Sequence, residues 1–395
     1  MQRKIAYHII YKTINDSSYT NLLMRKELDK LPLIQRGFVV TLVNGVLKKY
    51  NYLNYQHAAF YKNTSLKNKI ILSMAIYEKF FMNSKEYAVI NEYVKLAESK
   101  YDKAFINAIL HKIDKLNEPQ EAYLKESLPM WIYNLLAKQY SDDELNLILK
   151  NYSRIPETYY HLNTHKCSFD DLKEYDIEIV NDFLFISKEN LINTEMFKNG
   201  YFYIQDINAA SLINEFNFNH NDLFLDACSA PGSKLFNALE YIDDKNAYAN
   251  DLNLDRVNLI KDRAKVLGFD NIHYSCLDAS KLSSFYNFQF DKILLDVPCS
   301  GLGVIGRRND IKFHIKPASL DELETIQYDI LCDVSKLLKD NGYLIYSTCT
   351  LNKKENNKQI DRFLNEHKDF FLIKENTIIN MIGDMFYYAL IKKGI

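Results

Sequence analysis

The hydrophobic and polar positions of this chain follow a helical period over residues 1–125. Apolar residues recur three and four positions apart in "RKIAYHIIYKTI" (3–14), "RGFVVTLVNGVLKKYNYLNYQHAAFY" (36–61) and "KNKIILSMAIYEKFF" (67–81). This spacing places them on one face of each helix, and Gly and Pro are rare inside the segments. We therefore predict an all-α bundle for residues 1–125.

The pattern changes twice after this bundle. Residues 126–215 begin with the helical stretch "LPMWIYNLLAKQYSDDELNLILKNY" and continue with short runs typical of strands, "IPETYYHLN", "DFLFISK" and "YFYIQD". From residue 216, apolar strands alternate with amphipathic helices at a spacing of about 25 residues, which is typical of a doubly wound parallel sheet. We predict a small mixed α/β linking subdomain for residues 126–215 and a Rossmann-like α/β domain for residues 216–395.

Unusual residues follow four successive strands of this predicted sheet, at the edge where such sheets bind ligands. A turn of small residues, "DACSAPGSK", lets a ligand approach the backbone and opens a helix. Neither GxxxxGK[ST] nor GxGxxG is present, which disfavours a nucleotide triphosphate or a dinucleotide. The predicted ligand-binding residues are Cys228, Ser229, Ala230, Pro231, Gly232, Ser233, Lys234, Asp251, Asp278 and Asp296.

The carboxylates of this set suit an adenosine group. Asp251 ends the second strand, where a carboxylate accepts hydrogen bonds from a ribose diol. Asp278 ends the third strand, in a position suited to the adenine amino group. Each of them alone could be a helix cap. Together they favour an adenosyl ligand without phosphates, and S-adenosylmethionine fits that description.

Two thiols follow neighbouring strands of the predicted sheet, Cys299 in "DVPCSG" and Cys349 in "YSTCT". A single buried Cys is more often a small apolar residue than a nucleophile. Two of them at one edge, beside a methyl donor, suit methylation of a pyrimidine at C5. A thiolate that adds to C6 makes C5 nucleophilic, and a second thiol can assist release of the adduct.

Several segments carry a family resemblance. "LDACSAPGSK", "LLDVPCSGLGVIGRRNDIKF" and "YSTCTLNKKEN" resemble the signature blocks of the RNA 5-cytosine methyltransferases, and "YFYIQDINAASLI" resembles the block just before their methyltransferase fold. The region around "LPMWIYNLLAKQY" and "IPETYYHLN" resembles the linking region of the family, and the helical front resembles a NusB-type RNA-binding domain. The combination resembles the bacterial ribosomal RNA small-subunit methyltransferase B family (the Sun/Fmu type).

The resemblance implies a role for each matching residue. Cys349 would be the nucleophile and Cys299 the thiol that assists release, with S-adenosylmethionine held by the ten residues above. The implied product is 5-methylcytosine in small-subunit ribosomal RNA. The chain departs from the family pattern at three positions, where Ser229 replaces an alanine, Ser233 a glycine and His161 an arginine. A serine at 233 would weaken cofactor binding if that position required a positive φ.

The charge distribution adds a prediction about RNA. Residues 1–130 carry 20 Lys and Arg against 12 Asp and Glu, whereas the remainder carries 29 against 39. A basic front half suits a module that binds a polyanion. Within the acidic half, "GRRNDIKFHIK" is basic and follows the Cys299 loop. Its candidate phosphate contacts are Arg307, Arg308, Lys312 and Lys316.

Composition excludes several other classes. An apolar content of 47% with 25% charged residues is typical of a globular protein. No apolar run is long enough for a membrane span, and we expect no signal peptide, so the predicted location is the cytoplasm. The six cysteines form no CxxC or Cys/His cluster, and we expect no metal. We also expect a monomer.

Three alternative functions remain open at this point. A 5-cytosine methyltransferase could act on another RNA such as tRNA. An amino-directed methyltransferase would carry Asn/Asp-Pro-Pro-Tyr after the fourth strand, which "DVPCSG" does not match. A non-catalytic RNA-binding assembly factor with a degenerate cofactor site is supported only by Ser233 and His161.

Overall fold

The computed structural model describes residues 1–16 and 18–395, which divide into two compact units. One unit consists of Met1–Leu145 together with Arg308–Pro317, and the other of Asn146–Arg307 together with Ala318–Ile395. The first is helical, as the sequence pattern predicted. The second contains both sheets, so the predicted fold class of a helical front, a small α/β subdomain and a Rossmann-like domain is confirmed.

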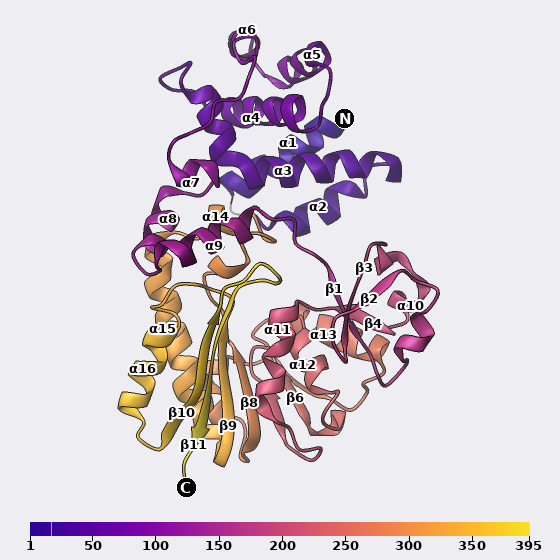
Figure 1. Cartoon of the computed structure of the whole chain (residues 1–395), viewed down its shortest axis with the longest axis vertical. Coiled ribbons are helices and arrows are strands. Elements are labelled where there is room, and N and C mark those ends of the chain that lie inside the picture. The colour runs from indigo at the N-terminus through magenta and orange to yellow at the C-terminus, as the bar shows by residue number, and fades with distance from the viewer. Residues whose placement is uncertain (17) are drawn as a thin grey trace. The chain divides into compact units, whose positions relative to one another are not determined.

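The helical unit is built around α3 and α4, which pack against α1, α5 and α6 (Figure 1). Gly45 lies where α3 crosses α4, and a Cβ atom there would stand 1.9 Å from the Tyr77 ring, so any larger residue would require this ring to move. The hydroxyl of Ser65 caps the first turn of α4 by accepting from the Asn68 N–H at 3.2 Å. The helices of this unit are α1 (Gln2–Asn15), α2 (Thr20–Leu28), α3 (Leu33–Ala58), α4 (Leu66–Phe81), α5 (Glu86–Leu96), α6 (Lys100–Leu110), α7 (Ala122–Lys125), α8 (Met130–Ala137) and α14 (Ile311–His314).

The segment that contains α14 follows the Cys299 loop in sequence but belongs to the helical unit. The Lys312 ammonium donates to the carbonyls of Lys48 and Ser127, both at 2.8 Å. The Phe313 ring packs edge-on against Tyr50, with 5.5 Å between the ring centroids. From the sequence we predict that this segment belongs to the C-terminal domain, because its residue pattern does not differ from that of the residues on either side.

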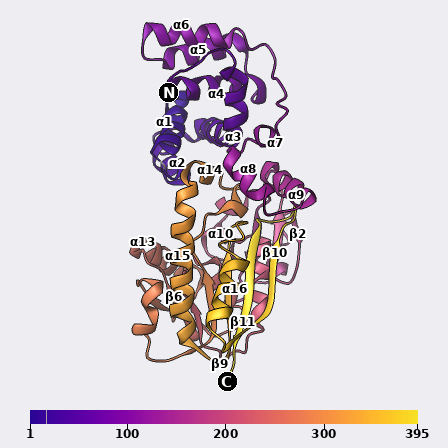
Figure 2. The ribbon, with the colours of Figure 1, turned by 90° about the vertical axis from the view of Figure 1, so that its left-hand side faces the viewer.

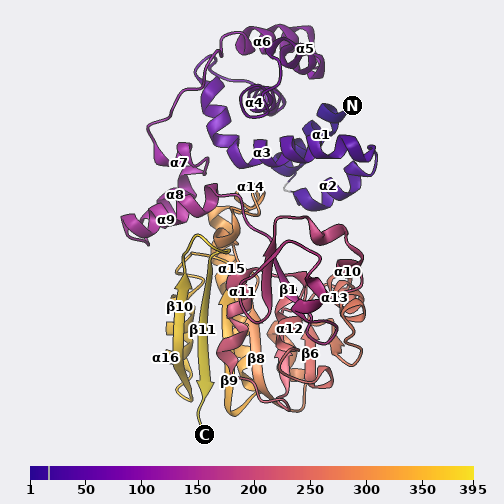
Figure 3. The ribbon, with the colours of Figure 1, turned by 45° about the vertical axis from the view of Figure 1, so that its right-hand side comes forward.

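The larger sheet of the second unit has the strand order β10-β11-β9-β8-β5-β6-β7 (Figure 3). Its strands from β9 to β7 are parallel, whereas β11 is antiparallel to both β9 and β10. The predicted parallel sheet is therefore extended at one edge by an antiparallel hairpin. The bounds are β5 (Phe224–Asp226), β6 (Ala247–Asn250), β7 (His273–Ser275), β8 (Phe290–Asp296), β9 (Leu338–Thr348), β10 (Phe370–Ile378) and β11 (Phe386–Lys393).

Helices cover both faces of this sheet, as its continuous apolar strands require. Residues of α15 and α16 pack with Leu225, Ile293 and Leu344 on one face (Figure 2), and residues of α12 and α13 pack with Phe224, Leu294 and Ile345 on the other. The helices are α9 (Asp142–Ser153), which crosses the division between the units, α10 (Glu195–Lys198), α11 (Ile207–Ser211), α12 (Ser233–Ala238), α13 (Leu254–Leu267), α15 (Pro317–Val334) and α16 (Asn357–Glu366).

The linking region forms a separate antiparallel sheet with the order β2-β3-β1-β4. Three of its strands, β1 (Tyr159–Leu162), β3 (Leu184–Ser187) and β4 (Phe202–Ile204), were predicted, and β2 (Ile177–Ile179) was not. Tyr160, Phe185 and Phe202 form the centre of its small core.

Candidate active site

The carboxyl ends of the parallel strands bring the predicted ligand residues to one edge of the sheet. β8 and β9 are neighbours, and Asp296 at the end of β8 lies opposite Ser347 near the end of β9. The Ser347 hydroxyl donates to Asp296 Oδ1 at 3.0 Å. The predicted adjacency of the strands that precede the two thiols is therefore present in the fold.

The loop between β5 and α12 forms one wall of this edge. The Ser229 N–H donates to the Asn250 carbonyl at 2.8 Å, which ties the loop to the end of β6. Gly232 has a φ of +97°, and a Cβ atom there would lie 2.9 Å from the Phe236 ring. Ser233 is the first residue of α12 and does not have a positive φ. Position 232 is therefore the one in this loop that requires glycine, and a serine at 233 causes no backbone strain.

Lys234 and Asp296 form a buried ion pair at the centre of the edge. The Lys234 ammonium lies 2.5 Å from Asp296 Oδ2. Burial disfavours the charged ammonium, but the Asp296 carboxylate more than offsets it, so the pKa of Lys234 is raised. A negative charge on Cys349 raises this pKa further.

Asp226 and Asp251 supply buried carboxylates beside this pair. Burial, reinforced by the nearby Asp296 carboxylate, raises the pKa of Asp226 to about 7. Within the described residues, Asp226 Oδ1 and Ser229 Oγ are buried and have no hydrogen-bond partner. Asp251 is 3% exposed, accepts from the Ala230 N–H at 3.3 Å and lies 3.3 Å from the Arg256 guanidinium.

Asp278 has a more exposed position than the other carboxylates. It caps the turn Ala279–Ser284 by accepting from the N–H and the hydroxyl of Ser280, at 3.0 and 2.8 Å. The hydrogen bond from the Ser280 hydroxyl lowers the pKa of Asp278. This is the capping role that a strand-end Asp often has, and it leaves the outer part of the carboxylate, which is 44% exposed, accessible to a ligand.

The structure places the two thiols of the strand-end loops side by side. The sulfur atoms of Cys299 and Cys349 are 3.2 Å apart, and both residues are free cysteines. The hydrogen bond with Cys349 and burial raise the pKa of Cys299 well above its usual value. Cys299 is therefore protonated at pH 7, and either sulfur can donate the hydrogen bond between them. Gly303 closes the Cys299 loop by donating to the Cys349 carbonyl at 2.8 Å, an approach that a Cβ atom would obstruct.

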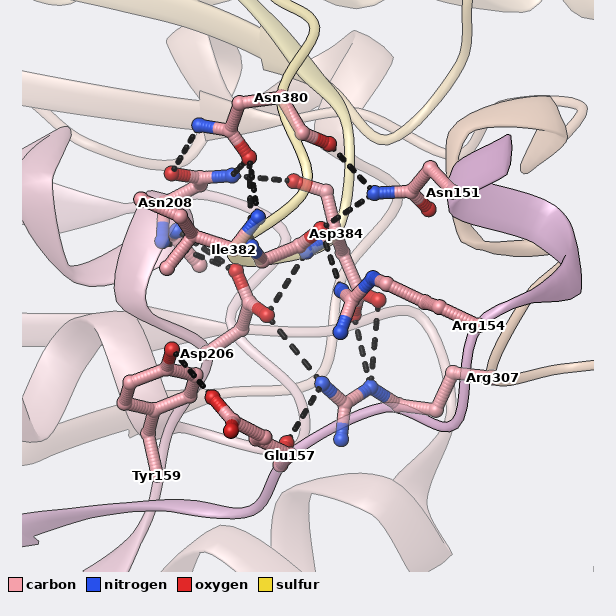
Figure 4. Close-up of polar contacts among 12 residues, drawn as sticks. Asn151, Arg154, Glu157, Tyr159, Asp206, Asn208, Arg307, Asn380, Ile382 and Asp384 are labelled. Carbon is pink, nitrogen blue, oxygen red and sulfur yellow. Dashed lines mark hydrogen bonds and ion pairs between the residues drawn. The ribbon is translucent and has the colours of Figure 1, made fainter. Parts of the chain in front are cut away.

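The predicted phosphate contacts are largely engaged inside the protein. Arg307 donates to both oxygens of Asp384, at 3.2 and 3.0 Å, and lies 3.3 Å from Asp206 Oδ2 (Figure 4). Lys312 is 5% exposed and bound to carbonyls, as described above. Arg308 lies 3.6 Å from Asp310, while Lys316 is exposed. The ion pairs of Arg307 and the burial of Lys312 argue against a direct phosphate contact by either residue.

The Arg307 cluster also connects distant segments of its unit. Asp206 caps α11 and accepts from the Asp384 N–H at 2.9 Å, and Asn151 on α9 donates to the carbonyls of Asn380 and Gly383, at 2.6 and 3.0 Å (Figure 4). The sequence does not predict this role of Arg307, because the residues around a basic side chain show the same pattern whether it binds phosphate or a buried carboxylate.

His161 is a buried residue of β1. Its ring stacks between Phe183 and Tyr203, with centroid distances of 5.5 and 4.8 Å. Nε2 lies 3.3 Å from the Asn237 side-chain oxygen. Burial lowers the pKa of His161 to about 4, so the imidazole is neutral at pH 7. The position therefore holds neither a cation nor an exposed RNA contact.

Two features are absent from residues 1–16 and 18–395. No group of three His, Cys, Asp or Glu side chains in that part of the chain could hold a metal ion. No helix formed by residues 1–16 and 18–395 has the length and apolar content needed to cross a membrane.

Comparison with known proteins covers both units. Residues 1–115 match the model of the NusB family, and residues 214–385 match the model described as 16S rRNA methyltransferase RsmB/F. The chain is 31% identical to the probable ribosomal RNA small subunit methyltransferase B of Bacillus subtilis (strain 168), across 93% of this chain and 89% of that protein. A protein of the same printed name from Coxiella burnetii is 29% identical, across 82% of this chain and 84% of the relative.

Solved structures show the same fold. The crystal structure of PH0851 superimposes with a TM-score of 0.78 at 21% identity and covers 98% of both chains. The structure of NSun6 from Pyrococcus horikoshii with SFG has a TM-score of 0.58 at 18% identity, across 67% of this chain and 98% of that one. At these identities the likeness concerns the fold alone.

Proposed function

Because the chain belongs to the ribosomal RNA small subunit methyltransferase B family, we propose that it transfers a methyl group from S-adenosylmethionine to C5 of a cytosine in small-subunit ribosomal RNA. The observation that carries this proposal is the pair of thiols 3.2 Å apart at the carboxyl edge of the sheet, beside a row of carboxylates. C5 chemistry needs a nucleophilic sulfur at C6, and Cys349 and Cys299 supply such a sulfur together with a donor next to it.

The residues at the sheet edge fit S-adenosylmethionine. The ligand carries a sulfonium and an ammonium, and the edge offers four carboxyl groups. Asp296 pairs with the buried Lys234, whereas Asp251 and Asp278 pair with Arg256 and Lys281, whose side chains are 55% and 76% exposed. The unpartnered Asp226 Oδ1 and Ser229 Oγ, in the described part of the loop, can accept or donate one hydrogen bond more. An acidic edge repels phosphate groups, which agrees with the absence of a phosphate-binding loop. The structure of NSun6 with SFG, an analogue of S-adenosylmethionine, supports the same assignment.

When bound, S-adenosylmethionine supplies an electrophilic methyl group. The Cys349 thiolate adds to C6 of the cytosine, which forms the S–C6 bond and moves electron density to C5. C5 would take the methyl group from bound S-adenosylmethionine, leaving S-adenosylhomocysteine, and the C5 proton would then pass to water. The electron pair of the C5–H bond re-forms the C5–C6 double bond and expels Cys349 as thiolate.

Two side chains of the protein would assist the first and the last step of this reaction. The Lys234 ammonium, paired with Asp296 at the same edge of the sheet, is the cation that we assign to the side of the attacking sulfur. The Cys299 thiol, held protonated 3.2 Å away, donates a hydrogen bond to the sulfur as it leaves C6. A cytosine inside a duplex cannot present C6 to a thiolate, so the target base must be unpaired or flipped out.

The experiment that tests this function is bisulfite sequencing of ribosomal RNA from a knockout strain, its parent and strains complemented with the wild-type gene or with Cys349→Ala. One protected cytosine in the small-subunit RNA should lose protection in the knockout and regain it only with the wild-type gene. Loss of protection in tRNA instead would identify the alternative substrate. Unchanged protection in every RNA would favour the non-catalytic assembly factor.

A further inference from the structure

A buried carboxylate, Glu355, lies beneath the two thiol loops. Its side chain is 0% exposed, and each of its oxygens accepts two hydrogen bonds. Oε2 accepts from the Ser300 N–H at 2.8 Å and from Gln327 Nε2 at 3.0 Å. Oε1 accepts from the Ser300 hydroxyl at 2.6 Å and from Asn352 Nδ2 at 3.1 Å.

Neutral groups supply all four of these donors. No Lys, Arg or His among the described residues forms an ion pair with Glu355. Burying a carboxylate is costly without compensating partners, and here the four hydrogen bonds supply them. The negative charge therefore lies next to the two thiol loops with no cation paired to it in the described part of the chain.

The contacts of Glu355 fix the backbone on both sides of Cys299. Ser300, the next residue, is held through its N–H and its hydroxyl. Pro298, the preceding residue, is held through its carbonyl by Gln327 at 2.9 Å, and Gln327 in turn donates to Glu355. Thr350, which follows Cys349, lies 2.6 Å from the Ser300 hydroxyl. Glu355 thus sets the position of one thiol loop relative to the other.

The charge of Glu355 also acts on the Cys299 thiol. The Cys349 hydrogen bond and burial are the main causes of the raised Cys299 pKa, and the carboxylates of Glu355 and Asp296 raise it further. Negative charge is therefore disfavoured on the Cys299 sulfur.

We infer that Glu355 is a positioning residue that holds Cys299 beside Cys349 and keeps Cys299 as the hydrogen-bond donor, so that only Cys349 attacks. The consequence for catalysis rests on the proposed covalent function, whereas the effect on the thiols does not. Glu355 acts through Cys299 and does not touch the reacting base.

The first experiment measures the thiols without RNA. The pH dependence of Cys299 alkylation by iodoacetamide is followed by peptide mass mapping in the wild type and in Glu355→Gln. Removal of the carboxylate should lower the midpoint for Cys299, because the charge of Glu355 contributes to the raised pKa of this thiol. Asp333→Asn is the matched control, because Asp333 is also buried and accepts from the N–H and the hydroxyl of one serine, Ser283, at 2.8 and 2.5 Å. That control should leave the midpoint unchanged.

The second experiment measures release of the product. With RNA and S-adenosylmethionine, Glu355→Gln should accumulate a denaturant-resistant protein–RNA adduct and release it about tenfold or more slowly than the wild type, because a small misplacement of a catalytic group has effects of this size. Asp333→Asn should accumulate none. In a Cys299→Ala background, Glu355→Gln should slow release no further.

Gln327→Met separates position from charge and also replaces Glu355→Gln if that variant does not fold. It removes the bonds to Pro298 and Glu355 but leaves the carboxylate, so it should slow release without lowering the alkylation midpoint. An unchanged midpoint in Glu355→Gln, or additive slowing with Cys299→Ala, would overturn the inference. A lowered midpoint in an enzyme that forms no adduct and no 5-methylcytosine would uphold the effect on the thiols and reject the proposed function.

Discussion

The sulfur atoms of Cys299 and Cys349 lie 3.2 Å apart, although 50 positions separate the two residues in the chain. The two sulfurs lie close together because β8 and β9 are neighbouring parallel strands that end at the same edge of the sheet. The two sulfurs have different surroundings. The hydrogen bond with Cys349 and burial raise the pKa of Cys299. The proposed mechanism makes Cys349 the attacking sulfur and Cys299 the donor, and substitutions can tell these two roles apart.

Single substitutions should separate the two roles. Cys349→Ala should abolish both methyl transfer and the covalent adduct, because no sulfur remains to attack C6. Cys299→Ala should still form the adduct and methylate, but it should remain bound to its product as a denaturant-resistant band on a gel. The double variant should give no band. Trapping in Cys349→Ala would reverse the assignment, and full turnover in both single variants would leave the cysteines without a catalytic role.

Asp251 should contribute directly to cofactor affinity. Asp251→Ala should weaken S-adenosylmethionine binding, measured by calorimetry, by about 1.5 to 3 kcal/mol, the range for hydrogen bonds to a charged group. The exposed Asp255, in the first turn of α13, is the control, and Asp255→Ala should bind as the wild type does. Undiminished affinity in Asp251→Ala would remove this residue from the site.

The loop before α12 should tolerate substitution of Ser233 but not of the adjacent Gly232. Gly232→Ala should weaken S-adenosylmethionine binding about tenfold or more, because its φ of +97° and the Phe236 ring at 2.9 Å force the loop to move. Ser233→Gly should change affinity by less than about twofold, since Ser233 already has no backbone strain. A large gain in affinity from Ser233→Gly would show that the serine does impair the site.

The basic surface of the helical unit should bind RNA by charge. Arg25 and Lys26 are exposed on α2, and reversing both to Glu should lower RNA affinity and make its salt dependence shallower by about one unit for each lost contact. Reversal of Lys173 and Lys188, which are 72% and 90% exposed in the linking subdomain, makes the same change of net charge elsewhere. Equal losses of RNA affinity in the two double variants would show that the net charge of the protein alone, and not the surface of α2, determines RNA binding.

The buried His161 should make the protein less stable in acid. Its pKa of about 4 in the folded state lies below the usual 6.5, so the unfolded chain binds more protons between these values. Stability from this residue is present above pH 6.5 and falls by about 3 kcal/mol as the pH approaches 4. His161→Phe keeps the ring stack and cannot take a proton. Its thermal unfolding should show a flatter pH dependence, and curves parallel to the wild type would contradict this account.

The sequence alone determined the elements of this protein and the residues at the sheet edge. Helical and strand periods are local properties, because burial of one face repeats at a fixed spacing along the chain. The same pattern predicts which residues lie at the ligand-binding edge, since parallel strands all end at one edge. These residues include Asp251, Asp296, Cys299 and Cys349. The family resemblance, confirmed by the relatives, assigned these positions their chemistry.

Only the tertiary structure decided the partners of individual side chains. Lys312 and Arg307 read as free cations in the sequence, yet one donates to buried carbonyls and the other to Asp384. Glu355 lies within the signature block "YSTCTLNKKEN", but nothing in the sequence showed that it joins both thiol loops. Such contacts connect positions far apart in the chain, and burial depends on the packing of whole elements. The local pattern of a charged residue is the same whether it faces water or a buried partner.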